Sequence, residues 1–184
     1  MATSGSGQGR PRRGGTRRPT SVAGVTSAAV ASALWRAAHE PDREDALLLD
    51  THAWLWTLNG STDDMAAEAV ALITAAAAAG RLYVSDISFW EVSLKAVKGK
   101  LALSIDPTLW LARAAAAPGI RGLPLTRDVL IQSTRLPGEP HGDPADRMLL
   151  AQAQLGGMSL LTCDRLIVEY AASQPGVPVC DARP

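Results

Sequence analysis

The chain has 184 residues, which is enough for one folded domain with its own core but few for two. Its 18 Lys and Arg residues balance its 18 Asp and Glu residues, so the net charge alone indicates no nucleic-acid or membrane partner. Two cysteines are too few for a disulfide framework, which excludes the small disulfide-rich secreted class and favours a reducing, cytoplasmic location.

The basic residues are concentrated near the amino end. The residues before Glu40 include six arginines and no acid, whereas from Asp45 onward 15 acidic residues outnumber 11 basic ones. Residues 1–44 are rich in Gly, Ser, Arg and Pro and offer too little apolar surface to fold alone, so we expect a disordered basic tail there and a folded domain over 45–184. A short helix within 23–38 or an export signal is the alternative for the tail. No segment is apolar over the roughly 18 residues that a membrane span requires.

Apolar runs and helical patterns alternate along the rest of the chain. Short apolar runs bounded by turn residues predict strands at 46–50, 82–85, 122–125 and 159–163, with an edge strand at 177–180. Helical spacing and caps predict helices at 64–79, 87–98, 106–117, 127–134 and 144–155. Strands that alternate with helices form βαβ units, so the expected fold is an α/β domain with a central parallel sheet of four to five strands flanked by helices.

Four acids fall at one edge of this predicted sheet. Asp50 ends the first strand and Asp164 follows the fourth. Glu91 lies one turn into the helix after the second strand, and Asp146 lies in the first turn of the helix at 144–155. Ligands of parallel sheets bind at the carboxyl ends of the strands, where these carboxylates would converge and repel one another. Hard oxygen ligands of this kind suit Mg²⁺ or Mn²⁺, so the pattern predicts a metal site.

Each of these acids also has a structural explanation. Asp143 followed by Pro144 has the pattern of a helix N-cap, which makes Asp146 an acid in the first turn that favours the helix dipole. Asp50 could cap the helix that starts just after the first strand, and Asp164 could begin a turn.

The surroundings of Glu91 allow a similar explanation. Ser88 and Glu91 have the spacing of a capping box, and Lys95 lies four residues after Glu91 as a helical ion-pair partner. The joint placement of all four acids at one edge of the sheet nevertheless favours the metal site over four separate structural explanations.

Four segments carry a resemblance to a known family. The segments LLLDTHAWLW (47–56), ISFWEVSLKAVKGKL (87–101), DPADRMLLAQAQLGG (143–157) and LLTCD (160–164) resemble, in order and spacing, the acidic motifs of PIN-domain ribonucleases. Within that superfamily they are most similar to VapC-type toxins of bacterial toxin-antitoxin pairs. The resemblance implies a PIN-like three-layer fold and an Mg²⁺-dependent or Mn²⁺-dependent endoribonuclease, commonly a homodimer, held inactive by a small antitoxin protein. By position, the residues that match the acids of that family are Asp50, Glu91, Asp146 and Asp164.

The resemblance implies a mechanism in which one or two divalent ions lower the pKa of a bound water, which attacks the phosphorus of an RNA strand. No Ser, Cys or His nucleophile is required, and His52 is expected to be packed or solvent-facing. Because RNA must be held against an acidic site, basic residues near the acids are predicted to contact phosphate, with an ordinary solvated helix face as the alternative. These residues are Lys95, Lys98, Lys100 and Arg147. The arginine-rich tail could add non-specific nucleic-acid affinity.

The tryptophans of the folded part are expected mainly in the core. Some could form a dimer or antitoxin surface, because Trp is favoured at the centres of protein interfaces. The four concerned are Trp54, Trp56, Trp90 and Trp110.

Two other functions remain open. A catalytically silent PIN-like module would keep the fold in order to bind RNA or an antitoxin. A phosphatase or phosphotransfer domain, of haloacid-dehalogenase or receiver type, would use Asp50 as the nucleophile or phosphoacceptor. The first type usually has a second aspartate where this chain has His52, and the second needs a lysine at a late strand end that the segment LLTCD lacks.

Overall fold

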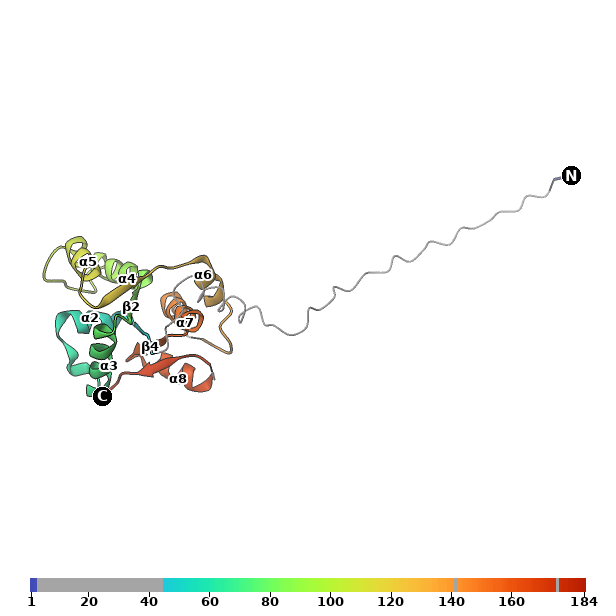
Figure 1. Ribbon diagram of the computed structural model, residues 1–184. Helices are drawn as coiled ribbons and strands as arrows, with labels where there is room; N and C mark the ends of the chain where they lie inside the picture. Colours follow the sequence, from blue (N-terminus) through green and yellow to red (C-terminus); the bar gives the residue numbers. More distant parts are fainter. Residues whose placement is uncertain (3–44, 141, 175) are drawn as a thin grey trace.

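The computed structural model describes residues 1–2, 45–140, 142–174 and 176–184, and the other residues are drawn as a thin grey trace in Figure 1. Apart from its first two residues, the disordered tail expected over 1–44 lies outside the described residues. So does the short helix considered within 23–38.

A five-stranded sheet lies at the centre of the described part, in the order β3-β2-β1-β4-β5, and every neighbouring pair is parallel. The strands are β1 (Leu47–Leu49), β2 (Leu82–Ser85), β3 (Ile120–Leu123), β4 (Ser159–Thr162) and β5 (Val179–Asp181). The chain adds β2 and β3 on one side of β1 and then returns to add β4 and β5 on the other side. The gap between β1 and β4 is therefore the topological switch point, where ligands bind in open parallel sheets.

Helices cover both faces of the sheet, which gives the three layers visible in Figure 1. They are α2 (Thr51–Asn59), α3 (Ala67–Ala78), α4 (Asp86–Val97), α5 (Pro107–Ala115), α6 (Arg127–Ser133), α7 (Pro144–Gly156) and α8 (Arg165–Ser173), with a short 3₁₀ turn, η1 (Thr62–Asp64). None of the helices in the described segments has the length and apolar character of a membrane span.

The alternation of side chains along β1 divides the core in two. Leu48 packs into one cluster, with residues of α6, α7 and α8, whereas Leu47 and Leu49 pack into the other, with residues of α2, α3 and α5. Helix α4 contributes to both clusters, through Ile87 and Val92. The predicted α/β class, with a parallel sheet flanked by helices, is confirmed.

Several element boundaries differ from the prediction. Helix α3 begins at Ala67 and not at residue 64, because Met65 is extended (φ −119°, ψ 147°) and buries its side chain. Strand β3 ends at Leu123, since Pro124 has no N–H with which to continue the ladder. No helix is expected over 165–173, where α8 lies. Its buried residues, Ile167 and Tyr170, lie three residues apart as on one helix face, so the prediction missed a short helical pattern.

Candidate active site

Asp50 and Asp164 lie at the carboxyl end of the sheet, at the switch point between β1 and β4. Leu49 pairs with Leu161 in the parallel register, and the backbone N–H of Asp50 donates to the Leu161 carbonyl at 3.0 Å. Thr162 joins the two acids: its hydroxyl donates to Oδ2 of Asp50 at 2.7 Å, and its Oγ1 accepts the backbone N–H of Asp164 at 2.9 Å. Because Thr162 is fully buried, this link between the two strand ends is shielded from water.

The Asp50 carboxylate is buried, with 3% of the residue exposed. Burial raises the pKa of this carboxyl against the opposing effects of the Thr162 hydrogen bond and the His52 charge, and the negative charge of Asp164 raises it further. Asp50 occupies the N-cap position of α2 but makes no side-chain capping hydrogen bond, so helix capping does not explain it. Buried charges in proteins are normally paired or coordinate metals. Within the described residues, no Lys or Arg forms an ion pair with Asp50.

Glu91 is tied to the same strand end through Thr51, the buried first residue of α2. The Thr51 hydroxyl donates to Oε2 of Glu91 at 2.7 Å, and its oxygen lies 2.9 Å from Oγ of Ser88 in a second hydrogen bond. The other Glu91 oxygen, Oε1, lies 3.7 Å from Nζ of Lys95, which confirms the predicted helical ion pair. Nζ of Lys95 also lies 3.5 Å from Nε2 of the exposed His52.

The capping box predicted for Ser88 and Glu91 is wrong. Helix α4 follows β2 without a loop, and its N-cap is Ser85, whose Oγ accepts the N–H of Ile87 at 3.1 Å. Ser88 therefore lies inside the helix with its side chain buried, and Glu91 lies in the second turn, where no capping role is available.

The structural explanations of Asp146 and Asp164 are supported in part. Asp143 caps α7 by accepting the N–H of Ala145 at 2.8 Å, as predicted, so Asp146 is the third residue of the helix and half-buried. Asp164 caps α8: its Oδ1 accepts the N–H groups of Leu166 at 2.7 Å and of Ile167 at 3.3 Å. Both capping bonds use Oδ1, so capping accounts for one of the two carboxylate oxygens of Asp164.

The structure thus links Asp50 to Asp164 through the Thr162 hydroxyl, and it holds Glu91 by a hydrogen bond from Thr51, the residue next to Asp50. Asp146 lies in the first turn of α7, a helix that packs against α4. Sequence patterns did not identify Thr51 or Thr162 as parts of the site. The available signal was a hydroxyl residue inside or beside a buried apolar strand, since such a group must find a hydrogen-bond partner.

The carboxylates at the switch point have the chemistry of ligands for a divalent metal ion. Among the described residues, no three Asp, Glu, His or Cys side chains are gathered closely enough to form a ready-made metal cage. Mg²⁺, however, usually keeps several waters and is bound through one or two carboxylates. Asp50 and Asp164 supply such a pair of hard oxygen donors, and the buried charge of Asp50 would be compensated by a cation. The residues at the switch point therefore fit a hydrated divalent ion.

Three of the four predicted phosphate contacts line one cavity, which we call the lysine hollow. It has a volume of about 300 Å³ and is lined by Trp90, Glu91, Leu94, Lys95, Lys98, Lys100, Asp143, Pro144 and Ala145. Lys98 and Lys100 are exposed, and neither forms an ion pair with another described residue. The fourth residue, Arg147, does not line this hollow, because its Nε donates to the Ser133 carbonyl at 2.9 Å, at the end of α6.

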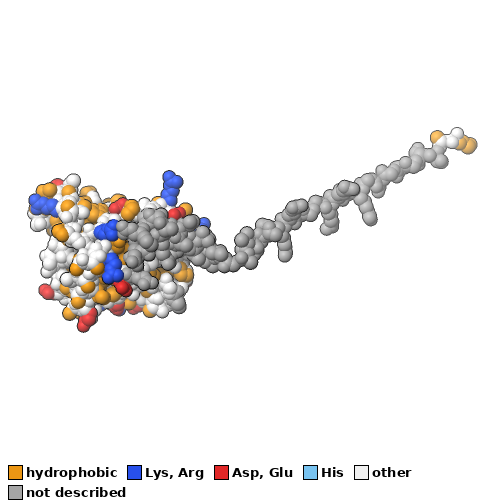
Figure 2. All heavy atoms as spheres, viewed as in Figure 1, with side chains coloured by type: hydrophobic (Ala, Val, Ile, Leu, Met, Phe, Trp, Pro, Cys, Tyr) orange, Lys and Arg blue, Asp and Glu red, His pale blue; other side chains and the backbone are white. Residues whose placement is uncertain are grey.

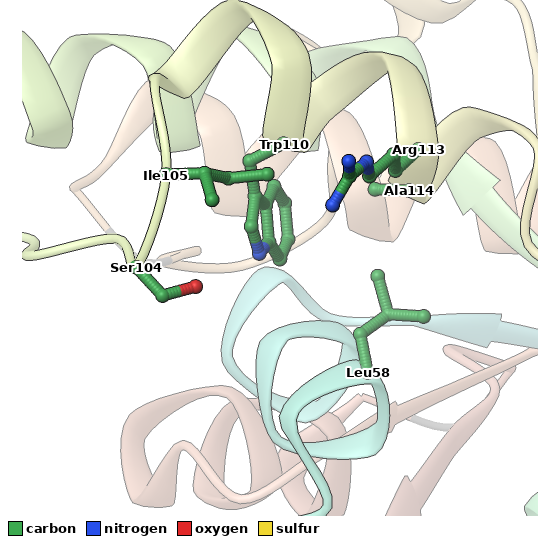
Figure 3. A pocket seen from close by; sticks show the side chains of 6 residues that line it. All are labelled: Leu58, Ser104, Ile105, Trp110, Arg113 and Ala114. Carbon is green, nitrogen blue, oxygen red and sulfur yellow. The ribbon is translucent and has the colours of Figure 1, made fainter.

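A separate cavity of about 270 Å³ lies between α2 and α5. Figure 3 shows Trp110 and Arg113 on α5 pointing toward Leu58 of α2 across this space. None of the four acids lines it, so it does not belong to the candidate site.

The chain is similar in sequence and in fold to proteins that are already known. Residues 47–172 match the PIN domain. Ribonuclease VapC22 of Mycobacterium tuberculosis is 32% identical to this chain over 130 residues, which cover 70% of this chain and 95% of that protein. Among solved structures, DNA-bound VapBC from Salmonella typhimurium is similar with a TM-score of 0.54 at 20% identity, covering 74% of this chain and 97% of that one. VapBC2 from Rickettsia felis, bound to a promoter DNA fragment, has a TM-score of 0.52 at 12% identity, covering 74% and 98%.

Proposed function

The chain belongs to the PIN domain family, and from this premise we propose that it is a VapC-type endoribonuclease, the toxin of a toxin-antitoxin pair, that requires Mg²⁺ or Mn²⁺. The observation that carries the proposal is the buried Asp50 carboxylate at the switch point, linked to Asp164 through Thr162. A buried acid that caps no helix and pairs with no Lys or Arg among the described residues is a group retained for function and not for folding.

The proposed catalytic and metal-binding residues are the four acids Asp50, Glu91, Asp146 and Asp164. A divalent ion bound there supplies a water of lowered pKa and neutralises charge that develops on the phosphate. The protein's own contribution is to hold the carboxylates: Thr162 fixes the Oδ2 atom of Asp50, and Thr51 fixes the Oε2 atom of Glu91. No Ser, Cys or His nucleophile has a role in this proposal.

The proposed substrate is single-stranded RNA whose phosphates are attracted to the lysine hollow. Lys98 and Lys100 are exposed there beside Glu91, so a phosphate in the hollow lies next to one of the proposed catalytic acids. Arg147, which donates to the Ser133 carbonyl, stays a weaker candidate for phosphate contact.

We further propose an antitoxin protein as partner and a homodimer as the assembly. Support for the antitoxin comes from the similarity to ribonuclease VapC22 of M. tuberculosis and from the VapBC complexes that share the fold. Light scattering on the purified chain measures the assembly, and a strictly monomeric protein would remove the homodimer from the proposal.

The test is cleavage of total bacterial RNA by the full chain, purified free of antitoxin, with Mg²⁺ or Mn²⁺ and with EDTA. Asp50→Asn and Asp146→Asn are compared with Asp128→Asn, which changes an exposed acid on α6. We expect discrete cuts that require the metal and that persist only in wild type and Asp128→Asn. The same cleavage pattern in wild type and both site variants would indicate a contaminating nuclease, and the absence of cleavage in all of them would favour a catalytically silent binding module.

A further inference from the structure

A second cavity, which we call the apolar hollow, adjoins the lysine hollow. It has a volume of about 360 Å³ and its walls include Ile87 and Trp90 of α4, Met148 of α7, and Leu125. Asp86, the first residue of α4, is the one charged residue among those that line it. The hollow is therefore an apolar recess with a single hydrogen-bond acceptor at its edge.

The two hollows adjoin each other, and both are lined by residues of α4 and α7. They share three lining residues, namely Trp90, Pro144 and Ala145, and the residue next to Trp90 is the proposed catalytic Glu91. A ligand in the apolar hollow thus contacts residues that also line the lysine hollow, where Glu91 and the three lysines lie.

Trp90 is the exposed member of an otherwise packed aromatic set. Trp54 and Trp110 are 0% and 9% exposed, and Phe89 packs against Trp54 with ring centroids 4.7 Å apart. Trp90 is 57% exposed, and it stacks on no ring within the described segments. Large exposed apolar groups that border a recess commonly mark a binding site.

We propose that the apolar hollow binds a nucleobase of the RNA, stacked on the Trp90 indole, while the lysine hollow holds the adjoining phosphate. This inference rests on the proposed function and adds the substrate contacts of the same site. Indole rings provide a stacking platform for unpaired bases, and lysines follow the backbone of a single strand. Asp86 repels phosphate but can accept a hydrogen bond from the exocyclic amino group of a base.

Charge argues against the other occupants of this groove. The lysine hollow has three lysines against two acids, Glu91 and Asp143, so the same hollow of a second copy offers no excess of negative charge to it. An apolar peptide would fill the apolar hollow but would gain no electrostatic attraction from the exposed Lys98 and Lys100. In a strand of RNA, each base lies next to a phosphate. One nucleotide can therefore place its ring in the apolar hollow and its phosphate in the lysine hollow.

The experiment measures binding of a short fluorescently labelled single-stranded RNA to the full chain in EDTA, so that cleavage does not interfere. A second probe of equal length carries abasic residues, which keep the phosphates and lack the rings. The variants are Trp90→Ala, Trp90→Phe and the control Val97→Ala, an exposed apolar residue on α4 that lines neither hollow.

We expect Trp90→Ala to bind the base-bearing RNA about 10-fold or more weakly and the abasic probe as wild type does. Trp90→Phe should retain most of the affinity, and Val97→Ala all of it. The inference would be overturned if Trp90→Ala bound the base-bearing RNA as tightly as wild type, or if it lost affinity equally for both probes. A change in the oligomeric state of Trp90→Ala, measured by light scattering, would also overturn it.

Failure of this inference can be separated from failure of the proposed function. If wild type cleaves total RNA in a metal-dependent way while Trp90→Ala has the same KM, only the nucleobase site is wrong. If wild type neither binds nor cleaves RNA, the proposed function itself fails.

Discussion

Asp50 combines burial, a hydrogen bond from Thr162 and a raised pKa, without a Lys or Arg partner among the described residues. Such a carboxylate destabilises the metal-free fold, because its charged form loses hydration that a single hydroxyl does not replace. Functional groups are commonly kept at this kind of cost to stability. The cost should therefore be measurable once the charge is removed.

We expect Asp50→Asn to raise the melting temperature of the metal-free protein by a few degrees at neutral pH. The native pKa of Asp50 is raised, so the folded chain holds this proton more tightly than the unfolded chain does. The difference from wild type should be absent below the ordinary pKa of 3.8 and should grow as the pH rises through the native value. Thermal unfolding in EDTA at several pH values measures it.

The control for this prediction is Asp128→Asn, because Asp128 is exposed on α6. Added Mn²⁺ should stabilise wild type and the control but not Asp50→Asn, since only a ligand that binds the native state shifts its stability. An Asp50→Asn variant less stable than wild type at neutral pH would show that the carboxylate serves the fold.

A second prediction at the scale of one residue concerns Thr51. Its hydroxyl is the donor that fixes Oε2 of Glu91, so Thr51→Val should leave that oxygen without its partner, whereas Thr51→Ser keeps the donor. Supporting residues of metal sites typically contribute about 10- to 100-fold in metal affinity or activity. We expect Thr51→Val to raise the Mg²⁺ concentration for half-maximal cleavage by a factor in this range, and Thr51→Ser to stay near wild type. Equal metal requirements in both variants would assign Thr51 to packing alone.

At the scale of elements, the strands were predictable because they are short apolar runs buried on both faces, such as β1 and β4. Helix α8 was missed, although Ile167 and Tyr170 have the i, i+3 spacing of one helix face, because so short a helix shows the pattern over few turns. The hydrogen bond from Thr162 to Asp50 joins residues 112 positions apart, so it follows from the pairing of β1 with β4 and not from any local pattern. The positions of the acids were thus predictable from strand ends, whereas the hydroxyls that hold them required the topology.

Helix α8 provides a test that separates capping from catalysis. Asp164 caps α8 and belongs to the proposed site, while Asp106 caps α5 by accepting the N–H groups of Thr108 and Leu109, at 2.9 and 3.2 Å. Asn is as good an N-cap as Asp, so Asp164→Asn and Asp106→Asn should each change the free energy of unfolding by less than about 0.5 kcal/mol.

Cleavage should fall by about 100-fold or more in Asp164→Asn and stay unchanged in Asp106→Asn, because only the first removes a carboxylate from the proposed site. Urea unfolding and RNA cleavage on the same preparations measure the two effects. Full activity in Asp164→Asn would show that Asp164 serves only as a helix cap.

At the scale of the whole molecule, the topology of the sheet places residues of the proposed site at one end of the sheet. Because β2 and β3 are added on one side of β1 and β4 and β5 on the other, the helices that follow β1, β2 and β4 all start at that end, and they carry Thr51, Glu91 and the Asp164 cap. On the face shown in Figure 2, basic side chains are dispersed among neutral and apolar ones and do not form one broad patch. Because acidic residues also outnumber basic ones from Asp45 onward, attraction of RNA by this part of the chain should depend on a few lysines.

The salt dependence of RNA binding tests that expectation. For single-stranded nucleic acid, the logarithm of affinity falls with the logarithm of salt concentration by about 0.7 for each phosphate neutralised. We expect the double variant Lys98→Glu with Lys100→Glu to lower the magnitude of this slope by about 1.4 and to weaken binding. The matched control is Arg113→Glu with Arg127→Glu, which changes the net charge equally at exposed positions of α5 and α6.

The control matters because the segment before Asp45 carries arginines of its own. If that segment supplies most phosphate contacts, both double variants should change the slope equally and slightly. If the lysine hollow holds the strand beside Glu91, the slope should fall only in the lysine variant, and deletion of residues 1–44 should leave that difference intact. An unchanged slope in the lysine variant would assign Lys98 and Lys100 to an ordinary solvated helix end.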